Sequence, residues 1–164
     1  MRTIVIGILL IVAVISCTNI DCPVENTVMT SYGLRKSDGG VDTLGVDTMW
    51  VWMKRVDHTD TLFINSLCGA NATGFKIPIS YTQPEDSIRI KVVDDSDNEW
   101  WDTICIKKDN MPHFESVDCQ ASYFHTLTGV KSTHHLIDTI VINNPDVNYD
   151  TSKQHLHLYL KARH

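Results

Sequence analysis

The stretch Ser87-Ile88-Arg89-Ile90-Lys91-Val92 alternates apolar and polar residues without a break. Successive side chains of a β-strand point to opposite faces, so the three aliphatic residues would face a core while the arginine and lysine face water. Near the C-terminus, His155-Leu156-His157-Leu158-Tyr159-Leu160-Lys161 repeats the pattern with its leucines directed inward. Both stretches predict half-buried strands.

Further apolar runs predict the remaining strands. Phe75, Ile77 and Ile79 share one face, and Pro78 within that run favours an edge strand or a bulge. The denser runs 49–53 and 137–142 are typical of central strands. The pairs Leu62/Ile64 and Ile104/Ile106 supply two more apolar strand faces, and the segments 26–34 and 122–127 are weaker candidates. Turn signals separate these runs, and no window shows a sustained helical face. We expect an all-β fold, an antiparallel β-sandwich of about seven to nine strands rather than a closed barrel.

Composition excludes several classes of protein. The chain has 164 residues, which suits one domain, with 43% hydrophobic and 21% charged residues. These fractions are close to globular averages and exclude a wholly disordered or collagen-like chain. The formal net charge is −6 and no Lys/Arg cluster occurs, so we expect no nucleic-acid partner.

The N-terminus predicts export. Arg2 precedes an apolar run, residues 3–15, that is too short to span a bilayer but fits the core of a signal peptide. The run ends in Val14-Ile15-Ser16-Cys17, which resembles the lipobox of bacterial lipoproteins. The resemblance implies cleavage after Ser16 and lipidation of Cys17. The predicted organisation is a signal peptide at 1–16, a lipidated N-terminus and short tether at 17–26, and one β-sandwich domain at 27–164. The alternatives are an ordinary secretory signal and an uncleaved transmembrane helix.

Cysteine content agrees with export. Besides Cys17 the chain has four cysteines: Cys22, Cys68, Cys105 and Cys119. An even number in an oxidising compartment predicts two disulfides, with three possible connectivities. We favour Cys22–Cys119 together with Cys68–Cys105. A zinc site is the weaker interpretation, since the four include no Cys-x-x-Cys pair.

The second half of the chain carries a specific resemblance. Cys22-Pro23 soon after the lipobox, the run Phe114-Glu115-Ser116-Val117-Asp118-Cys119 and the Thr/Ile/Asp segment 133–140 follow in order. This order resembles a family of small Bacteroidetes outer-membrane lipoproteins classed as a domain of unknown function. Gln120 departs from the Gly that follows the later cysteine in many members, and Cys68 and Cys105 lie outside the pattern. The resemblance implies an outer-membrane location and no established activity.

Three clusters could bind a ligand. Residues 94–99 gather carboxylates, which favours a solvated turn over a calcium site because the EF-hand spacing is missing. His134, His135, His155 and His157 suit zinc, but we favour the interpretation that they lie on an exposed polar strand face. Trp50 and Trp52 share one face of a predicted central strand, which favours core packing. Trp100 and Trp101 would point to opposite faces, so one of them could lie exposed beside the acidic loop.

No catalytic motif is present, and we predict no enzyme activity, no cofactor and no metal. The sequence Asp-(Ser/Thr)-apolar recurs and looks like an acceptor for bacterial O-glycosylation, with candidate hydroxyls on Thr43, Thr48, Thr61, Ser87, Thr103 and Thr139. The simpler interpretation is that Asp caps a turn while Thr begins a strand. The sequence favours a non-catalytic binding or structural module of the envelope, anchored by lipid and contacting an envelope protein or glycan. A metal- or glycan-binding accessory module is the alternative, and an enzyme the third.

Overall fold

A computed structural model describes residues 27–162, and within that range it contains ten strands and no helix. The strands are β1 (Met29–Arg35), β2 (Gly45–Lys54), β3 (Asp60–Gly69), β4 (Gly74–Pro78), β5 (Glu85–Val93), β6 (Glu99–His113), β7 (Ser122–Ser132), β8 (Ile137–Ile142), β9 (Asp146–Val147) and β10 (Leu156–Leu160). The all-β prediction is confirmed. The expected boundaries at residues 16 and 26 lie outside the described residues.

The strands form two sheets, one of which curls into a half-barrel. The smaller has the order β4-β1-β10-β8 and the larger the order β3-β2-β5-β6-β7-β9. Strands β1 and β10 pair in parallel, so the fold is not wholly antiparallel, and ten strands exceed the expected seven to nine. The two strands come from opposite ends of the described chain, which is why no local turn joins them.

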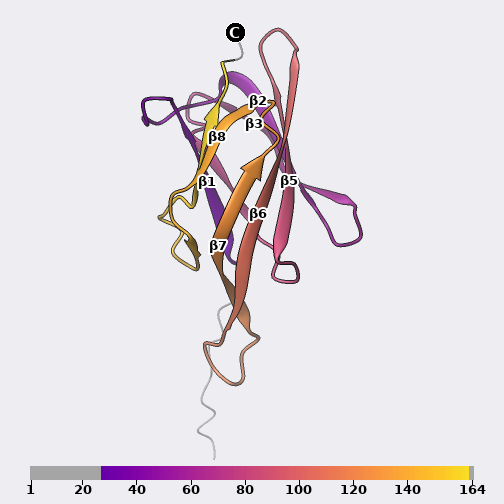
Figure 1. Ribbon diagram of the computed structural model, residues 1–164, viewed down its shortest axis with the longest axis vertical. Coiled ribbons are helices and arrows are strands. Elements are labelled where there is room, and N and C mark those ends of the chain that lie inside the picture. Colours follow the sequence, from indigo (N-terminus) through magenta and orange to yellow (C-terminus); the bar gives the residue numbers. More distant parts are fainter. Residues whose placement is uncertain (1–26, 163–164) are drawn as a thin grey trace, which may run out of the picture.

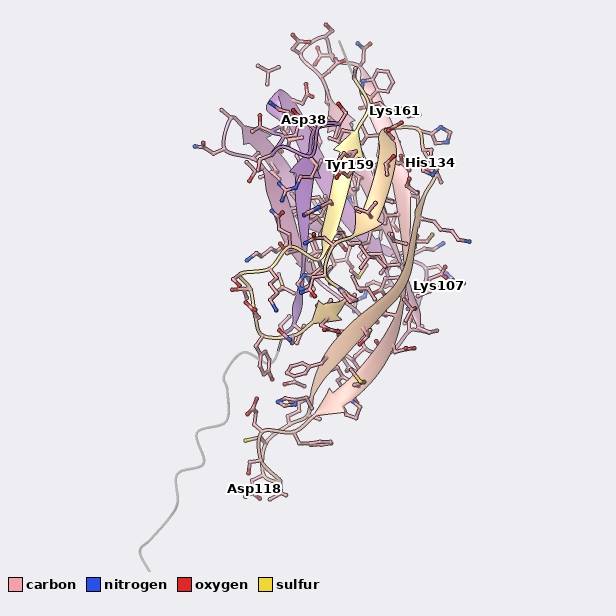
Figure 2. All side chains as sticks on the ribbon, turned by 60° about the vertical axis from the view of Figure 1, so that its left-hand side comes forward. Asp38, Lys107, Asp118, His134, Tyr159 and Lys161 are labelled. Carbon is pink, nitrogen blue, oxygen red and sulfur yellow. The ribbon has the colours of Figure 1, made fainter. Side chains whose placement is uncertain are left out.

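The two sheets share one hydrophobic core. Ile88, Ile90 and Val92 of β5 are buried, as their alternation predicts, and Leu156 and Leu158 of β10 meet them from the smaller sheet's side of the core. The loop between β6 and β7 extends beyond the other strands (Figure 1), with Asp118 near its tip and Lys161 at the far end of the molecule (Figure 2).

Two predicted strand positions need correction and one is confirmed. β4 is an edge strand ending at Pro78, as expected. The run 137–142 was expected to be central, but β8 lies at the edge of the smaller sheet, and among the described strands it pairs only with β10. Leu62 and Ile64 do not share a buried face, because register shifts between β2 and β3 leave Leu62 exposed opposite Trp52.

Candidate functional site

The tryptophans of β2 lie on the outer face of the larger sheet, and the expectation of core packing is wrong. Met49, Val51 and Met53 fill the core, so Trp50 and Trp52 between them point the other way and remain half-buried. A period of two fixes that these two tryptophans share a face but does not fix which face is buried. In β2 the buried face is the one that carries Met49, Val51 and Met53.

Trp101 joins these two side chains on the same outer face. The ladder sets Trp50 opposite Lys91, and Lys91 opposite Trp101. Trp101 also stacks on Trp52, with ring centroids 5.6 Å apart, and is 37% exposed. Trp100 points inward and packs against the core. The expectation that one of the adjacent pair is exposed beside the acidic loop is confirmed, and Trp50, Trp52 and Trp101 define what we call the tryptophan face.

Two cations lie over the tryptophan face. Arg89 lies 5.1 Å from the Trp101 ring centroid, and the Lys91 ammonium lies 5.3 Å from the Trp50 ring and 5.5 Å from the Trp101 ring. These are cation–π distances. Arg89 also pairs with Asp60 at 2.9 Å, and Lys91 pairs with Glu99. Each cation therefore has a carboxylate partner, and these four groups together add no net charge to the face.

Hydrogen bonds to one carboxylate organise the acidic loop beside this face. Asp94 accepts hydrogen bonds from the Ser96 and Asn98 backbone N–H groups, both at 2.9 Å, and from the Asn98 amide and the Trp100 indole. The hydrogen bonds from Asn98 and Trp100 lower the pKa of Asp94 to about 2. The loop therefore has a structural explanation as a turn. Across residues 27–162 no group of three or more His, Cys, Asp or Glu side chains is placed to hold a metal ion.

The histidines considered for zinc are not brought together. His155 lies just before β10 and is buried, with its Nδ1 accepting a hydrogen bond from the Ser31 backbone N–H at 2.9 Å. The backbone carbonyl of His134 accepts from Lys161, which follows β10, so these two histidines lie at opposite ends of the strand. His155 is thus not part of an exposed polar face, contrary to that expectation.

The expected Cys68–Cys105 disulfide is wrong, because both thiols are free. Cys68 lies on β3 and Cys105 on β6, and β2 and β5 run between them. Three strand spacings amount to about 14 Å, whereas bridged Cα atoms lie within about 7 Å. For the other pair, Cys119 is buried and its expected partner Cys22 lies outside the described residues, as does Cys17. That bridge and the lipidation remain predictions.

The recurring Asp-(Ser/Thr)-apolar sequences divide by burial. Asp47, Asp86 and Asp102 are buried, and Asp102 receives six hydrogen bonds, from the groups Thr103 N, Thr133 N and Oγ1, His135 N, Leu136 N and Ile137 N. The buried carboxylate of Asp102 therefore has a structural role, but Asp47 and Asp102 lie within β2 and β6 and not in a turn before a strand, so the turn-capping interpretation is wrong for these two copies. Of the six candidate hydroxyls, Thr139 is exposed and the other five are half-buried. Glycosylation itself stays a prediction.

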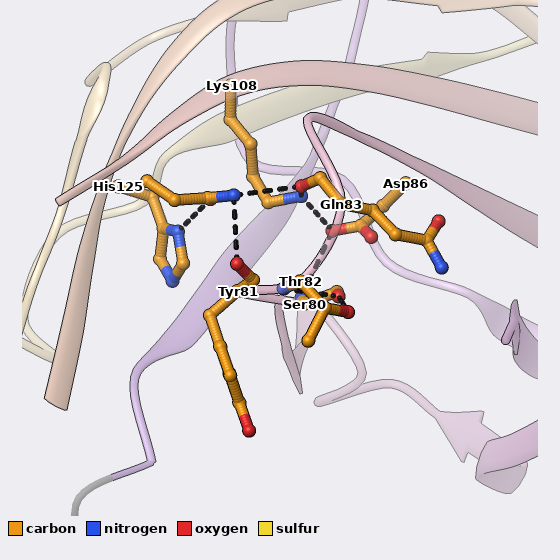
Figure 3. A network of polar contacts seen from close by, with 8 residues as sticks. Ser80, Tyr81, Thr82, Gln83, Asp86, Lys108 and His125 are labelled. Atoms are coloured by element: carbon orange, nitrogen blue, oxygen red, sulfur yellow. Dashed lines mark hydrogen bonds and ion pairs between the residues drawn. The ribbon is translucent and has the colours of Figure 1, made fainter. Parts of the chain in front are cut away.

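A buried polar network beneath the 80–84 loop had no signal in the sequence. Lys108 pairs with Asp86 at 2.7 Å and donates to the Gln83 carbonyl at 2.9 Å (Figure 3). The Asn110 amide donates to the carbonyls of Tyr81 at 3.1 Å and Gln83 at 2.9 Å, so its oxygen accepts from His125 Nδ1 at 2.7 Å. His125 is therefore the tautomer with its proton on Nδ1. Burial and the charge of Lys108 lower the pKa of His125 to about 4.

The fold and the tryptophan face define a class of protein: an all-β module of two sheets that displays aromatic side chains on one sheet face. The chain belongs to a family of unknown function (DUF6452), whose model matches residues 25–160. The resemblance to a domain of unknown function is thereby confirmed. No curated protein and no solved structure matches the chain. Within residues 27–162 there is no helix that could span a membrane.

Proposed function

We propose that this protein is a non-catalytic binding module of the bacterial cell envelope whose tryptophan face binds a neutral glycan. The observation that carries the proposal is the placement of Trp50, Trp52 and Trp101 together on the outer face of one sheet. A cluster of aromatic side chains on a protein surface marks an interaction site more often than a single exposed apolar residue does. A sugar ring has an apolar C–H face that packs on an indole, and hydroxyls at its rim.

The charges around this face favour a neutral saccharide over an anionic polymer. Arg89 and Lys91 are already paired with Asp60 and Glu99, so neither cation is available without breaking an existing ion pair. The paired groups can still hydrogen-bond to hydroxyls at the edge of a sugar ring. Asn65, whose side-chain oxygen accepts from the Trp50 indole at 3.1 Å, adds a polar group at the same edge.

Affinity electrophoresis tests this proposal. The full chain is run through gels containing dextran, mannan or a mixed-linkage β-glucan, with alginate as the anionic comparison. We expect at least one neutral polysaccharide to retard the protein and Trp101→Ala to abolish the retardation. The matched control is Phe114→Ala, which removes an exposed aromatic ring outside this face. The proposal fails if no neutral polysaccharide retards the protein, or if both variants lose retardation equally.

We also propose that lipid on Cys17 holds the module at the outer membrane of a Bacteroidetes cell. The support is the short apolar run followed by Val14-Ile15-Ser16-Cys17, since two or more acyl chains anchor a protein stably whereas one does so only marginally. Cys17→Ala should release the protein from the membrane fraction or stall its processing. Unchanged processing with the variant still in the detergent phase contradicts the anchor, and does so independently of glycan binding.

A further inference from the structure

A cavity separate from the tryptophan face opens beside the buried polar network. Its volume is about 660 Å³, and it lies among the end of β2, the start of β3, the 80–84 loop and the start of β7. Cavities of roughly 300–1,000 Å³ are typical of small-molecule sites. None of the three residues of the tryptophan face lines this cavity.

Aromatic and aliphatic side chains form the wall of this cavity. Tyr81 stacks on Tyr123 with ring centroids 4.6 Å apart, and Phe63 lines the same space. Tyr81 is 56% exposed, so a ligand in the cavity can reach this side chain. Such a wall suits a flat apolar body, because aromatic rings in offset contact gain more than their buried area alone provides.

The charge of the cavity is opposite to that of the whole chain. Lys54 and Arg55 line the cavity and no Asp or Glu does, although the chain has 20 acidic and 14 basic residues. Among the described residues, neither cation forms an ion pair within 4.0 Å. Hydrogen bonds from Thr59 and, to a lesser degree, the charge of Arg55 lower the pKa of Asp57, which does not line the cavity. An anionic group would therefore find two cations here without displacing a bound carboxylate.

The polar network fixes one wall before any ligand arrives. Asn110 and Lys108 hold the carbonyls of Tyr81 and Gln83, and Asp86 accepts from the Ser80 backbone N–H at 3.1 Å (Figure 3). The loop that carries Tyr81 is therefore tied to β5 and β6 at four points. A wall that is already ordered reduces the entropy that binding must overcome.

We propose that this cavity binds a small free carboxylate with an aromatic body, the ring packing on Tyr81 and the carboxylate lying between Lys54 and Arg55. This site is separate from the tryptophan face, so either proposal can fail without the other. The volume of about 660 Å³ fits a small molecule and not a folded partner, which is why the proposal commits to a small molecule.

Isothermal titration calorimetry on the full chain in lipid nanodiscs tests the site, with empty nanodiscs as the blank. The probes are 4-phenylbutyrate and 4-phenylbutylamine, which share a body and differ in the sign of their charge. We expect the carboxylate to bind about tenfold more tightly than the amine, since two nearby cations in a partly solvated site supply a Coulomb difference of that order.

Two variants locate the effect. Lys54→Gln with Arg55→Gln should remove the preference for the carboxylate. Lys36→Gln with Lys131→Gln removes the same number of positive charges at exposed positions outside the cavity lining and should leave this preference unchanged. Tyr81→Ala should weaken both probes several-fold while the melting temperature stays within a few degrees. The proposal is overturned by equal binding of the two probes, by no binding of either, or by an equal effect of both double variants.

Discussion

Lys108 and Asp86 form an ion pair of 2.7 Å whose side chains are 0% and 1% exposed. Burial raises the pKa of Asp86, although the hydrogen bond and charge of Lys108 and the Ser80 N–H oppose that rise. One carboxylate oxygen, Oδ1, has no hydrogen-bond partner among the described residues. A buried pair of this kind gains little net stability, because desolvation cancels most of the attraction. Its effect is positional: it ties the 80–84 loop to β5 and β6.

Replacing one member of this pair should lower the free energy of unfolding far more than replacing both. We expect Lys108→Met to lower the free energy of unfolding by about 3–5 kcal/mol, since it leaves Asp86 charged, buried and unpaired. Asp86→Leu with Lys108→Met should recover most of that loss. The control is the neighbouring Lys107→Met, which disrupts only an exposed pair at 4.0 Å with Glu85 and should cost under about 1 kcal/mol. Urea unfolding measures all three, and equal losses in Lys107→Met and Lys108→Met would contradict the argument.

Asp102 and Asp138 begin the same three-residue motif but differ in burial, which gives a second test. Asp102→Asn removes one carboxylate oxygen that accepts from the start of β8 and the residues just before it, where the Leu136 and Ile137 N–H groups are buried. Unsatisfied buried donors cost about 1–3 kcal/mol each, so we expect a loss of about 2–4 kcal/mol. Asp138→Asn on the exposed surface should change stability by under about 0.5 kcal/mol. Thermal unfolding of the two variants measures this difference. Indistinguishable melting temperatures would show that Asp102 does not hold the residues at the start of β8 in place.

Period-two patterning predicted the strands better than it predicted their surroundings. The alternation in β5 and β10 correctly identified the buried faces, because aliphatic residues alternate with charged residues in β5 and with His157 and Tyr159 in β10, which leaves one choice. In β2 both faces are apolar, and hydropathy alone could not decide between the tryptophans and the Met49/Val51/Met53 set. Large side chains half-buried under cations can stay on an outer face, which made the burial expectation for Trp50 and Trp52 wrong.

Local sequence patterns could not predict which strands pair, because the paired strands lie far apart along the chain. The parallel β1–β10 pair joins segments more than a hundred residues apart, and the strand order between β3 and β6 separates Cys68 from Cys105. Buried carboxylates were equally hidden, since Asp86 and Asp102 read locally as turn residues. The cavity cations Lys54 and Arg55 appeared only as an isolated basic pair until the fold set them beside Tyr81.

Acid should destabilise this protein through His125. Its pKa is about 4 in the folded state because of burial and the charge of Lys108, against roughly 6.5 in the unfolded chain. Between these values the unfolded state binds the extra proton, so the free energy of unfolding rises with pH and is lost as the pH falls from about 6.5 to about 4. The contribution of this one side chain should reach about 3 kcal/mol across that window. Urea unfolding at pH 7, 6, 5 and 4 measures it.

His125→Asn separates this effect from the other titrating groups. Asparagine places an amide N–H near the position of Nδ1, so it can still donate to the Asn110 oxygen but binds no proton in this range. We expect the variant to be less stable than the wild type at pH 7 yet to lose about 3 kcal/mol less between pH 7 and pH 4. The exposed His134→Asn serves as control and should follow the wild-type curve. Parallel curves for His125→Asn and wild type would mean that another group carries the acid sensitivity, with buried His155, whose pKa burial also lowers, as the next histidine to replace.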